Sequence, residues 1–322
     1  MNRRSLAVRI GRLAQSLPQS WLRPIESPFV RTLVRADPNV IFLLALPRSG
    51  STLTYQALVH ALEPHYLSNL GNLLYGLPWL GLKSSQLFCG HHDSNFRSKH
   101  GFVEGLCGPA EGLKYWSYWT GVGLTDRHTL ARNDGKLAQR VNYFRDAVRA
   151  TATPRAPMIA GYLGHTLVAK QLREWFPSAV FIRLHRDPLS NALSLLRSRA
   201  DKYNKWFSVK PKECEDMEDR TVQAQVAAQV YWLNRRLDAL AHDDRTINIG
   251  YEELANAPNT TMNRIIHDGN ACGLSLEMQK TLPSYFTHRV ADPDQDKDAA
   301  AIFNEIRNLE QVHGPLKRSA QH

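Results

Sequence analysis

One uninterrupted apolar stretch limits the chain to a small group of folds. Residues 39–46 read NVIFLLAL, so every residue after the asparagine is apolar, and prolines at positions 38 and 47 bound the run. A strand buried on both faces has this pattern, whereas a strand with one face in water alternates apolar and polar residues. Strands buried on both faces belong to parallel sheets that helices cover. The sequence therefore predicts a central parallel sheet.

Three shorter apolar runs follow at intervals that leave room for helices between them. They occupy residues 158–160, 179–184 and 246–249. Because strands and helices alternate, we expect an α/β fold, with a doubly wound parallel sheet as the middle of three layers. The predicted helices lie at residues 51–62, about 136–150, 167–175, 189–200, 222–241 and 260–272.

We expect a basic N-terminal segment, residues 1–36, followed by a single domain, residues 37–322, with an insertion at about 64–155 that lacks a sheet pattern. The net charge of the chain is +10, and residues 1–36 contribute +6 of it through seven arginines and one glutamate. The basic charge is therefore mostly an N-terminal feature and does not form a stripe for nucleic acid. No nucleic-acid partner is expected.

Two interpretations of the N-terminal segment stay open. Its apolar residues alternate with arginines in an approximately helical pattern, so a helix here lies on an anionic membrane surface or packs across the domain with its arginines in water. No run reaches the roughly 18 apolar residues that a membrane-spanning helix needs, so we expect a soluble or peripheral protein. The apolar positions are Leu6, Val8, Ile10, Leu13 and Leu17.

The cysteines predict neither a disulfide framework nor a metal site. Cys89, Cys107, Cys214 and Cys272 are far apart, and no C-x-x-C pair or zinc-type histidine spacing occurs. This usage is typical of a reducing compartment, and a cytoplasmic location is expected.

The segment after the first predicted strand is suited to bind an anion. Residues 46–53 read LPRSGSTL and lead from the strand into a helix, which places backbone N–H groups and the positive helix end around one point. Where a Walker A loop of an NTPase has its lysine, this chain has Ser51, and Arg48 supplies the positive charge instead. Taken alone, the segment could also be an ordinary strand-to-helix connection with a surface arginine.

A second arginine follows another predicted strand. Residues 185–188 read HRDP, and Ser194 comes two helical turns after Arg186, so both side chains can face the crevice at the strand ends. Together with the first loop, these residues resemble the two donor-binding signatures of the sulfotransferase superfamily. The resemblance extends from Asn39 to about Gly273. It includes Trp232 and the YEEL sequence at 251–254, which look architectural.

The resemblance implies a P-loop-like sulfotransferase fold and transfer of a sulfuryl group from 3'-phosphoadenosine 5'-phosphosulfate (PAPS) to a hydroxyl or amine, without a metal. The form of the loop is closer to bacterial, carbohydrate and tyrosylprotein sulfotransferases than to the cytosolic enzymes, which implies a saccharide or lipid-linked acceptor. Leu53 stands where relatives often have an adenine-stacking tryptophan, so the adenine contact must lie elsewhere. The implied 5'-phosphosulfate ligands are Arg48, also catalytic, with Ser49, Gly50, Ser51 and Thr52, and those of the 3'-phosphate are Arg186 and Ser194.

The general base has two leading candidates. Further candidates, each of which alone is more often a surface or capping residue, are His91, His92, Asp93, His100 and Glu104. Some relatives carry a glutamate about twenty residues after the loop arginine, but residues 67–72 contain no carboxylate. Others use a histidine after the next strand, a position that His165 matches, although a helix-capping histidine is an equal alternative. Glu111 is the second candidate, because turn residues flank it and an aromatic block, residues 115–119, follows it. This block is also a candidate platform for a sugar ring.

Two other functional classes stay open. A kinase or NTPase of related fold would need the missing lysine and an acidic strand end for its metal. An inactive nucleotide-binding module would keep the loop and use the aromatic region for interactions. Residues 202–219, which are charged and rich in turn formers, are expected to form a loop or lid over the active face.

Overall fold

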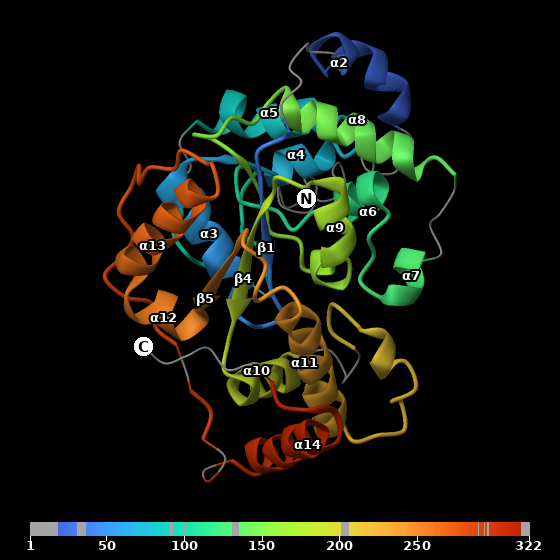
Figure 1. Cartoon of the computed structure of the whole chain (residues 1–322), viewed down its shortest axis with the longest axis vertical. Helices are drawn as coiled ribbons and strands as arrows, with labels where there is room; N and C mark the ends of the chain where they lie inside the picture. Colours follow the sequence, from blue (N-terminus) through green and yellow to red (C-terminus); the bar gives the residue numbers. More distant parts are fainter. Residues whose placement is uncertain are drawn as a thin grey trace, which may run out of the picture.

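A sheet of five parallel strands forms the centre of the computed structural model, which describes residues 19–30, 37–90, 93–98, 101–130, 135–200, 206–288, 290–292, 294 and 296–316 (Figure 1). The predicted α/β fold with a central parallel sheet is confirmed. Across the sheet the strands are β2 (His65–Tyr66), β3 (Met158–Ala160), β1 (Val40–Leu44), β4 (Val180–His185) and β5 (Thr246–Gly250).

The order of the strands creates a crevice beside β1. β1 is the central strand. The next two strands in the sequence, β2 and β3, lie on one side of it, and the last two, β4 and β5, lie on the other. Ile41 of β1 pairs with Ile159 of β3 and with Val180 of β4. The connections after β1 and β4 therefore leave from neighbouring strand ends, which is the usual place for a ligand in an open α/β sheet.

Each of the six predicted helices is present, with ends within three residues of the expected positions. They are α3 (Ser51–Leu62), α8 (Leu137–Arg149), α9 (Ala169–Trp175), α10 (Pro188–Ala200), α11 (Val222–Asp238) and α13 (Pro258–Ala271). The sequence analysis did not anticipate η1 (Gln19–Leu22), α2 (Arg23–Val30), α4 (Asn69–Leu73), α5 (Pro78–Cys89), α6 (Leu113–Thr120), α7 (Asp126–Leu130), η2 (Leu163–Leu167), η3 (Lys212–Cys214), α12 (Tyr251–Asn256) and α14 (Lys297–His313).

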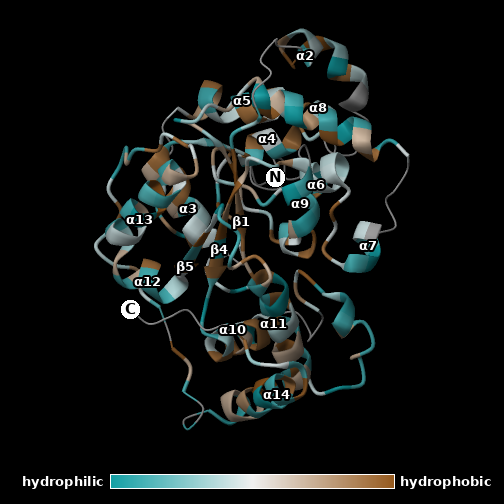
Figure 2. Cartoon of the chain, in the orientation of Figure 1, coloured by the Kyte–Doolittle hydropathy of each residue, from teal (hydrophilic) through white to brown (hydrophobic). Residues whose placement is uncertain are grey.

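Helices cover both faces of the sheet. In Figure 1, α3 and α13 lie on one side of the strands and α6 and α9 on the other. Helices α10, α11 and α14 pack together beyond the carboxyl ends of the strands. Apolar residues line the strands and the inner helix faces, while the outer helix faces are largely hydrophilic (Figure 2). Every residue of β1 is buried, as its unbroken apolar run predicts.

The aromatic block of the predicted insertion belongs to the core. Tyr115, Trp116 and Trp119 on α6 are fully buried. The Trp116 ring lies 6.4 Å from that of Phe42 in β1 and 5.4 Å from that of Phe144 in α8. The insertion is therefore packed on the sheet through large aromatic side chains, which contribute strongly to burial. The proposed domain limits stay predictions.

The described part of the N-terminal segment packs on the domain. Glu26 of α2 is buried, and its carboxylate accepts hydrogen bonds from the Leu80 backbone N–H at 3.1 Å and the Tyr143 hydroxyl at 3.0 Å. The Arg23 guanidinium lies over the Trp119 ring at 4.9 Å. This agrees with packing across the domain for residues 19–30, while the apolar and basic pattern at residues 6–17 lies outside the described residues.

The prediction that the cysteines form no disulfide was wrong. Cys89 at the end of α5 is bonded to Cys107, 18 residues further along the chain, while Cys214 and Cys272 are free. The bond fixes the segment that precedes Glu111 to α5. Disulfides are rare in reducing compartments, so the cysteines no longer support the expected cytoplasmic location.

Candidate active site

The loop after β1 has a backbone that few residues tolerate. Arg48 has a φ of 63° and Gly50 a φ of 92°, both in the left-handed region. Gly50 is needed here for a second reason, because a Cβ at this position would lie 2.1 Å from Cδ2 of Tyr251. The Ser49 hydroxyl donates to the Leu46 carbonyl at 2.8 Å and closes the turn. The loop then enters α3, whose N-terminus favours an anion.

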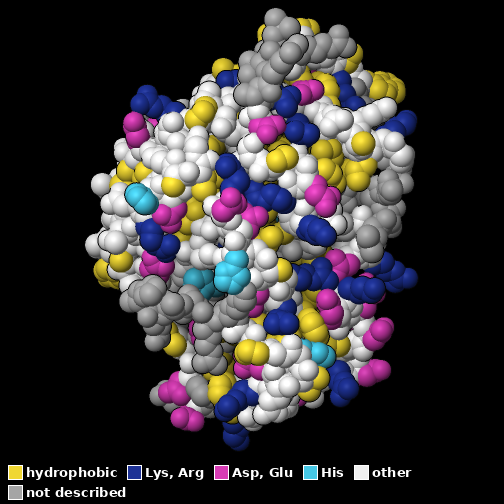
Figure 3. Space-filling view, in the orientation of Figure 1, with side chains coloured by type: hydrophobic (Ala, Val, Ile, Leu, Met, Phe, Trp, Pro, Cys, Tyr) yellow, Lys and Arg dark blue, Asp and Glu magenta, His cyan; other side chains and the backbone are white. Residues whose placement is uncertain are grey.

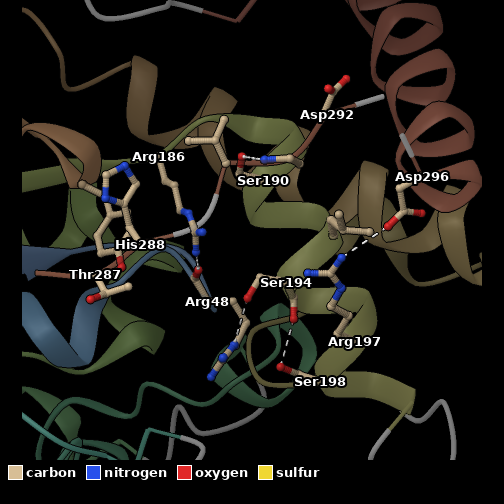
Figure 4. A pocket seen from close by; sticks show the side chains of 14 residues that line it. Arg48, Arg186, Ser190, Ser194, Arg197, Ser198, Thr287, His288, Asp292 and Asp296 are labelled. Carbon is tan, nitrogen blue, oxygen red and sulfur yellow. Dashed lines mark hydrogen bonds and ion pairs between the residues drawn. The ribbon is translucent and has the colours of Figure 1, made fainter. Parts of the chain in front are cut away.

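The two arginines expected at neighbouring strand ends come together. Arg186 donates from Nη1 to the Arg48 carbonyl oxygen at 2.7 Å, and Arg48 Nε donates to the Ser194 hydroxyl at 3.4 Å (Figure 4). Asn191 of α10 also donates to the Pro47 carbonyl at 2.7 Å. The connection after β4 thus holds the loop after β1 by hydrogen bonds to its backbone.

Tyr251 is a site residue that the sequence analysis had assigned to packing. It opens α12 directly after β5, and its ring covers Gly50. The Arg186 guanidinium lies over the same ring at 4.7 Å, a cation–π contact. Burial raises the pKa of the Tyr251 hydroxyl, although Arg186 opposes the shift. The YEEL sequence could have revealed this residue, because it follows a third strand at the same edge of the sheet.

Two cavities meet at these side chains. The first has a volume of about 800 Å³ and the second of about 490 Å³. Arg48, Arg186 and Tyr251 line both of them. The shared wall therefore carries two guanidinium groups, so an anionic group bound there would be accessible from both sides.

One face of α10 lines the first cavity with hydroxyl groups. Ser190, Ser194 and Ser198 recur every fourth residue, so they lie along one side of the helix (Figure 4). Residues 287–288 and 290–292 also line this cavity, and the Ala291 N–H donates a hydrogen bond of 2.9 Å to the Ser190 hydroxyl. The spacing of the serines was readable from the sequence, and only Ser194 was singled out there.

Glu111 lines the second cavity together with the start of α3. Ser51 and Thr52 lie in the same wall, on the side of the loop after β1. Burial raises the pKa of the Glu111 carboxyl to about 7. The group can therefore take up a proton near neutral pH, as a general base must.

His165 lies in neither cavity. Its side chain is 0% exposed, and its ring makes edge contacts with Phe42 at 5.1 Å and Trp116 at 4.4 Å. Within the described part of the chain, neither of its ring nitrogens has a hydrogen-bond partner. Burial lowers the pKa of the imidazole to about 3, so it stays neutral at physiological pH. The structure does not bring this candidate base to the two arginines.

The remaining candidates are placed more simply. Glu104 is exposed and Asp93 pairs with Lys280 at 2.6 Å, whereas His91, His92 and His100 lie outside the described residues. The predicted lid is described from residue 206 onward, and Trp206, Phe207 and Ser208 line the second cavity.

Two further observations concern surface charge and metal binding. Basic and acidic side chains are intermixed on the face drawn in Figure 3. Among the described residues, no cluster of three or more histidine, cysteine, aspartate or glutamate side chains is arranged to hold a metal ion.

The chain belongs to the sulfotransferase family, because the sequence model of that family matches residues 38–277. The predicted membership of the sulfotransferase family is thereby confirmed, while the roles of the two arginine-bearing strand ends stay predictions. A comparison with curated protein sequences gave no match.

Solved structures with similarity to the chain are also sulfotransferases. A sulfotransferase from Mycobacterium avium is 18% identical with a TM-score of 0.49, over 94% of this chain and 75% of that chain. The sulfotransferase domain of a Synechococcus olefin synthase is 18% identical with a TM-score of 0.40, over 77% of each chain. A sulfotransferase domain from the curacin biosynthetic pathway is 19% identical with a TM-score of 0.40, over 72% of this chain and 74% of that chain.

The burial of His165 predicts that the fold is sensitive to acid. As pH falls from 6.5 towards about 3, the unfolded chain binds a proton at this residue that the folded chain excludes, so stability decreases. This linkage amounts to about 2 kcal/mol at about pH 5. When pH is lowered from about 7.5 to about 5, the free energy of unfolding of His165→Leu should therefore rise by about this amount relative to that of the wild type. Urea unfolding at both pH values measures the difference, and the exposed His267→Leu serves as control. An unchanged difference between His165→Leu and the wild type would contradict a buried neutral imidazole.

Proposed function

We propose that the chain transfers the sulfuryl group of PAPS to an acceptor hydroxyl or amine. The observation that carries this proposal is the wall of Arg48, Arg186 and Tyr251 between two cavities. Two substrates that react must reach one point, and these three side chains are accessible from both cavities. Membership of the sulfotransferase family supports the same reaction.

The first cavity suits the nucleotide of the donor. Arg186 and Ser194 would hold its 3'-phosphate there. Arg48, which lines both cavities, and the backbone N–H groups of residues 49–52, of which 50–52 line the second cavity, would hold the 5'-phosphosulfate. A guanidinium fork matches the geometry of phosphate and sulfate oxygens. The ring of His288 lines this cavity and lies 6.3 Å from that of Tyr251, so it is our candidate for the adenine contact.

Charge and protons balance in this arrangement. The acceptor oxygen forms a bond to sulfur while the bond from sulfur to the bridging phosphate oxygen breaks, and adenosine 3',5'-bisphosphate (PAP) leaves. Arg48 stabilises the negative charge that grows on the bridging oxygen. Glu111 accepts the acceptor proton, because it lines the second cavity beside Ser51 and Thr52. We propose no metal for this step.

The donor assignment predicts a selective nucleotide affinity. PAP should bind more tightly than ATP, and Arg186→Ala should weaken PAP binding about tenfold or more through loss of charge-assisted hydrogen bonds. With an active acceptor, Arg48→Ala should lower turnover by about two to three orders of magnitude. Calorimetry and radiolabelled sulfate transfer measure both effects, and Arg155→Ala, whose side chain lies on the surface beside Glu277, is the control. Preference for ATP would support the kinase or NTPase alternative instead.

The choice of base predicts a particular pH dependence. Because burial raises the Glu111 pKa to about 7, the wild-type rate should fall as pH decreases through this value. Glu111→Gln should lose about two to four orders of magnitude in turnover and also the acidic limb of the profile. Glu104→Gln, on the same segment, should behave as the wild type.

His165 gives the decisive comparison for the base. An unperturbed histidine would titrate at nearly the same pH as Glu111, so the pH profile alone does not separate the two. Retained turnover in Glu111→Gln together with its loss in a folded His165→Leu would refute the assignment.

We also propose a peripheral membrane contact at the N-terminal segment. Trp21, Ile25 and Phe29 are exposed on one face of η1 and α2, whereas Glu26 on the opposite face is buried. Exposed aromatic and apolar side chains next to a basic segment are typical of helices that lie in a bilayer interface. No helix among the described residues is long and apolar enough to span a membrane.

Vesicle sedimentation tests this contact. The chain should pellet with vesicles that contain phosphatidylserine and less with pure phosphatidylcholine, because the basic residues favour an anionic surface. The triple variant Trp21→Ser, Ile25→Ser, Phe29→Ser should stay largely in the supernatant. Val312→Ser removes an equally exposed apolar side chain from α14 and should pellet as the wild type does. Equal sedimentation of the triple variant would exclude this face.

A further inference from the structure

The loop after β1 begins with a tight turn whose third residue is unusual. Residues 46–49 form this turn, which the Ser49 backbone N–H closes by donating to the Leu46 carbonyl oxygen at 3.2 Å. Proline stands at the second position of the turn, and Arg48, at the third position, has a φ of 63°. Proline followed by a residue with positive φ is typical of a type II turn, in which glycine or asparagine is the usual third residue. An arginine at this position is strained.

A turn of these four residues also has a less strained form. In a type I turn the peptide between the second and third residues is turned over, and the third residue has a negative φ. Proline at the second position is compatible with both types. Because an arginine by itself favours the type I form, contacts from outside the turn must stabilise the form that is observed. Turning this peptide over would change the backbone from which the Arg48 side chain extends.

Asn191 of α10 holds the peptide that distinguishes the two turn types. Its side-chain amide donates to the Pro47 carbonyl oxygen at 2.7 Å. This carbonyl belongs to the peptide between the second and third residues of the turn, so the hydrogen bond fixes its orientation. Arg186 donates to the next carbonyl, that of Arg48, also at 2.7 Å (Figure 4). Two successive carbonyls of the turn are therefore held from the segment that follows β4.

Asn191 lies beneath the site and is not part of its surface. It is 1% exposed and is not among the described residues that line the two cavities. Arg186, in contrast, lines both cavities, so its substitution would remove a ligand contact together with the hydrogen bond to the loop. Asn191 can affect a bound nucleotide only through the backbone that it holds. It therefore isolates the contribution of the loop conformation.

We infer that Asn191 is a positioning residue, which keeps the peptide between Pro47 and Arg48 in the orientation that places Arg48 for the 5'-phosphosulfate. This inference rests on the proposed sulfuryl transfer. The hydrogen bond from Asn191 offsets the strain at Arg48, and its loss would allow the peptide to turn over. The helix that carries Ser194, a proposed ligand of the 3'-phosphate, would thus also set the loop for the other end of the same nucleotide.

Partial nucleotides separate the loop from the rest of the site. Adenosine 5'-phosphosulfate (APS) lacks the 3'-phosphate, whereas adenosine 3'-monophosphate lacks the 5' group. Calorimetry measures the Kd of both ligands and of PAP for the wild type and for Asn191→Leu, which keeps a branched side chain and removes its N–H groups. We expect the Kd of APS and PAP to rise about tenfold and that of adenosine 3'-monophosphate to stay unchanged. A residue that only stabilised α10 would affect both partial nucleotides, because Ser194 lies on this helix.

Turnover gives a second measurement. With an active acceptor, kcat of Asn191→Leu should fall about tenfold or more, because Arg48 would no longer be aimed at the charge that develops in the transition state. The KM for the acceptor should stay unchanged, since Asn191 lines neither cavity among the described residues.

A second buried asparagine provides the matched control. Asn234 on α11 is 6% exposed, and its amide donates to the Val230 carbonyl of the same helix at 2.9 Å. Asn234→Leu removes a similar hydrogen bond away from the loop and should change neither nucleotide affinity nor kcat. Asn191→Ala, with a smaller side chain, is measured in parallel, and urea unfolding identifies which variants are folded.

The outcomes separate this inference from the donor assignment. Absence of PAP binding in the wild type would overturn both. Binding of PAP by the wild type, together with unchanged APS affinity in a folded Asn191→Leu or Asn191→Ala, would overturn the inference alone. Equal losses of affinity for APS and adenosine 3'-monophosphate would also overturn it, because the effect would then be a general one on α10.

Discussion

The two halves of the site depend on one hydrogen bond between charged and backbone groups: Arg186, which follows β4, donates to the backbone carbonyl of Arg48 after β1. The bond stabilises a loop whose Arg48 has a φ of 63°, a conformation that costs roughly 1–2 kcal/mol for a residue with a side chain. With the loop in this conformation, the guanidinium groups of Arg48 and Arg186 line both cavities. The strand order makes this possible, because β1 and β4 are neighbours although 135 residues, 45–179, lie between the end of β1 at Leu44 and the start of β4 at Val180.

The sheet and its flanking helices were predictable because their signals are local. The run at 39–46 and the helix at 51–62 are long, regular and bounded by prolines or glycine, so composition alone identifies them. The insertion was not predictable in the same way. Helices such as α4 and α7 have five residues each, which is too short for a helical period to appear. The disulfide was missed because a spacing of 18 residues has no meaning until α5 brings Cys89 to Cys107.

The site shows the same division between local and spatial information. Arg48, Arg186 and Ser194 follow from strand ends and helical spacing, both of which are local. The roles of His165 and Glu111 depend instead on the path of the chain after β3 and before α6, because this path decides whether each side chain lies in the core or in a cavity. A sequence cannot show that the turn after β3 directs His165 into the aromatic core, nor that the strand-free segment before α6 brings Glu111 back to the start of α3.

The lining of the second cavity determines the proton affinity of Glu111. Glu111 has a pKa of about 7 because burial disfavours its charged form, and the burial comes from the segments that also bring leucine and aromatic side chains into the cavity. A carboxylate that is open to water has a pKa nearer 4.5, where it is a weaker base. A ligand that displaces water from the second cavity would preserve the shift. The segments that enclose the second cavity therefore also set the proton affinity of Glu111.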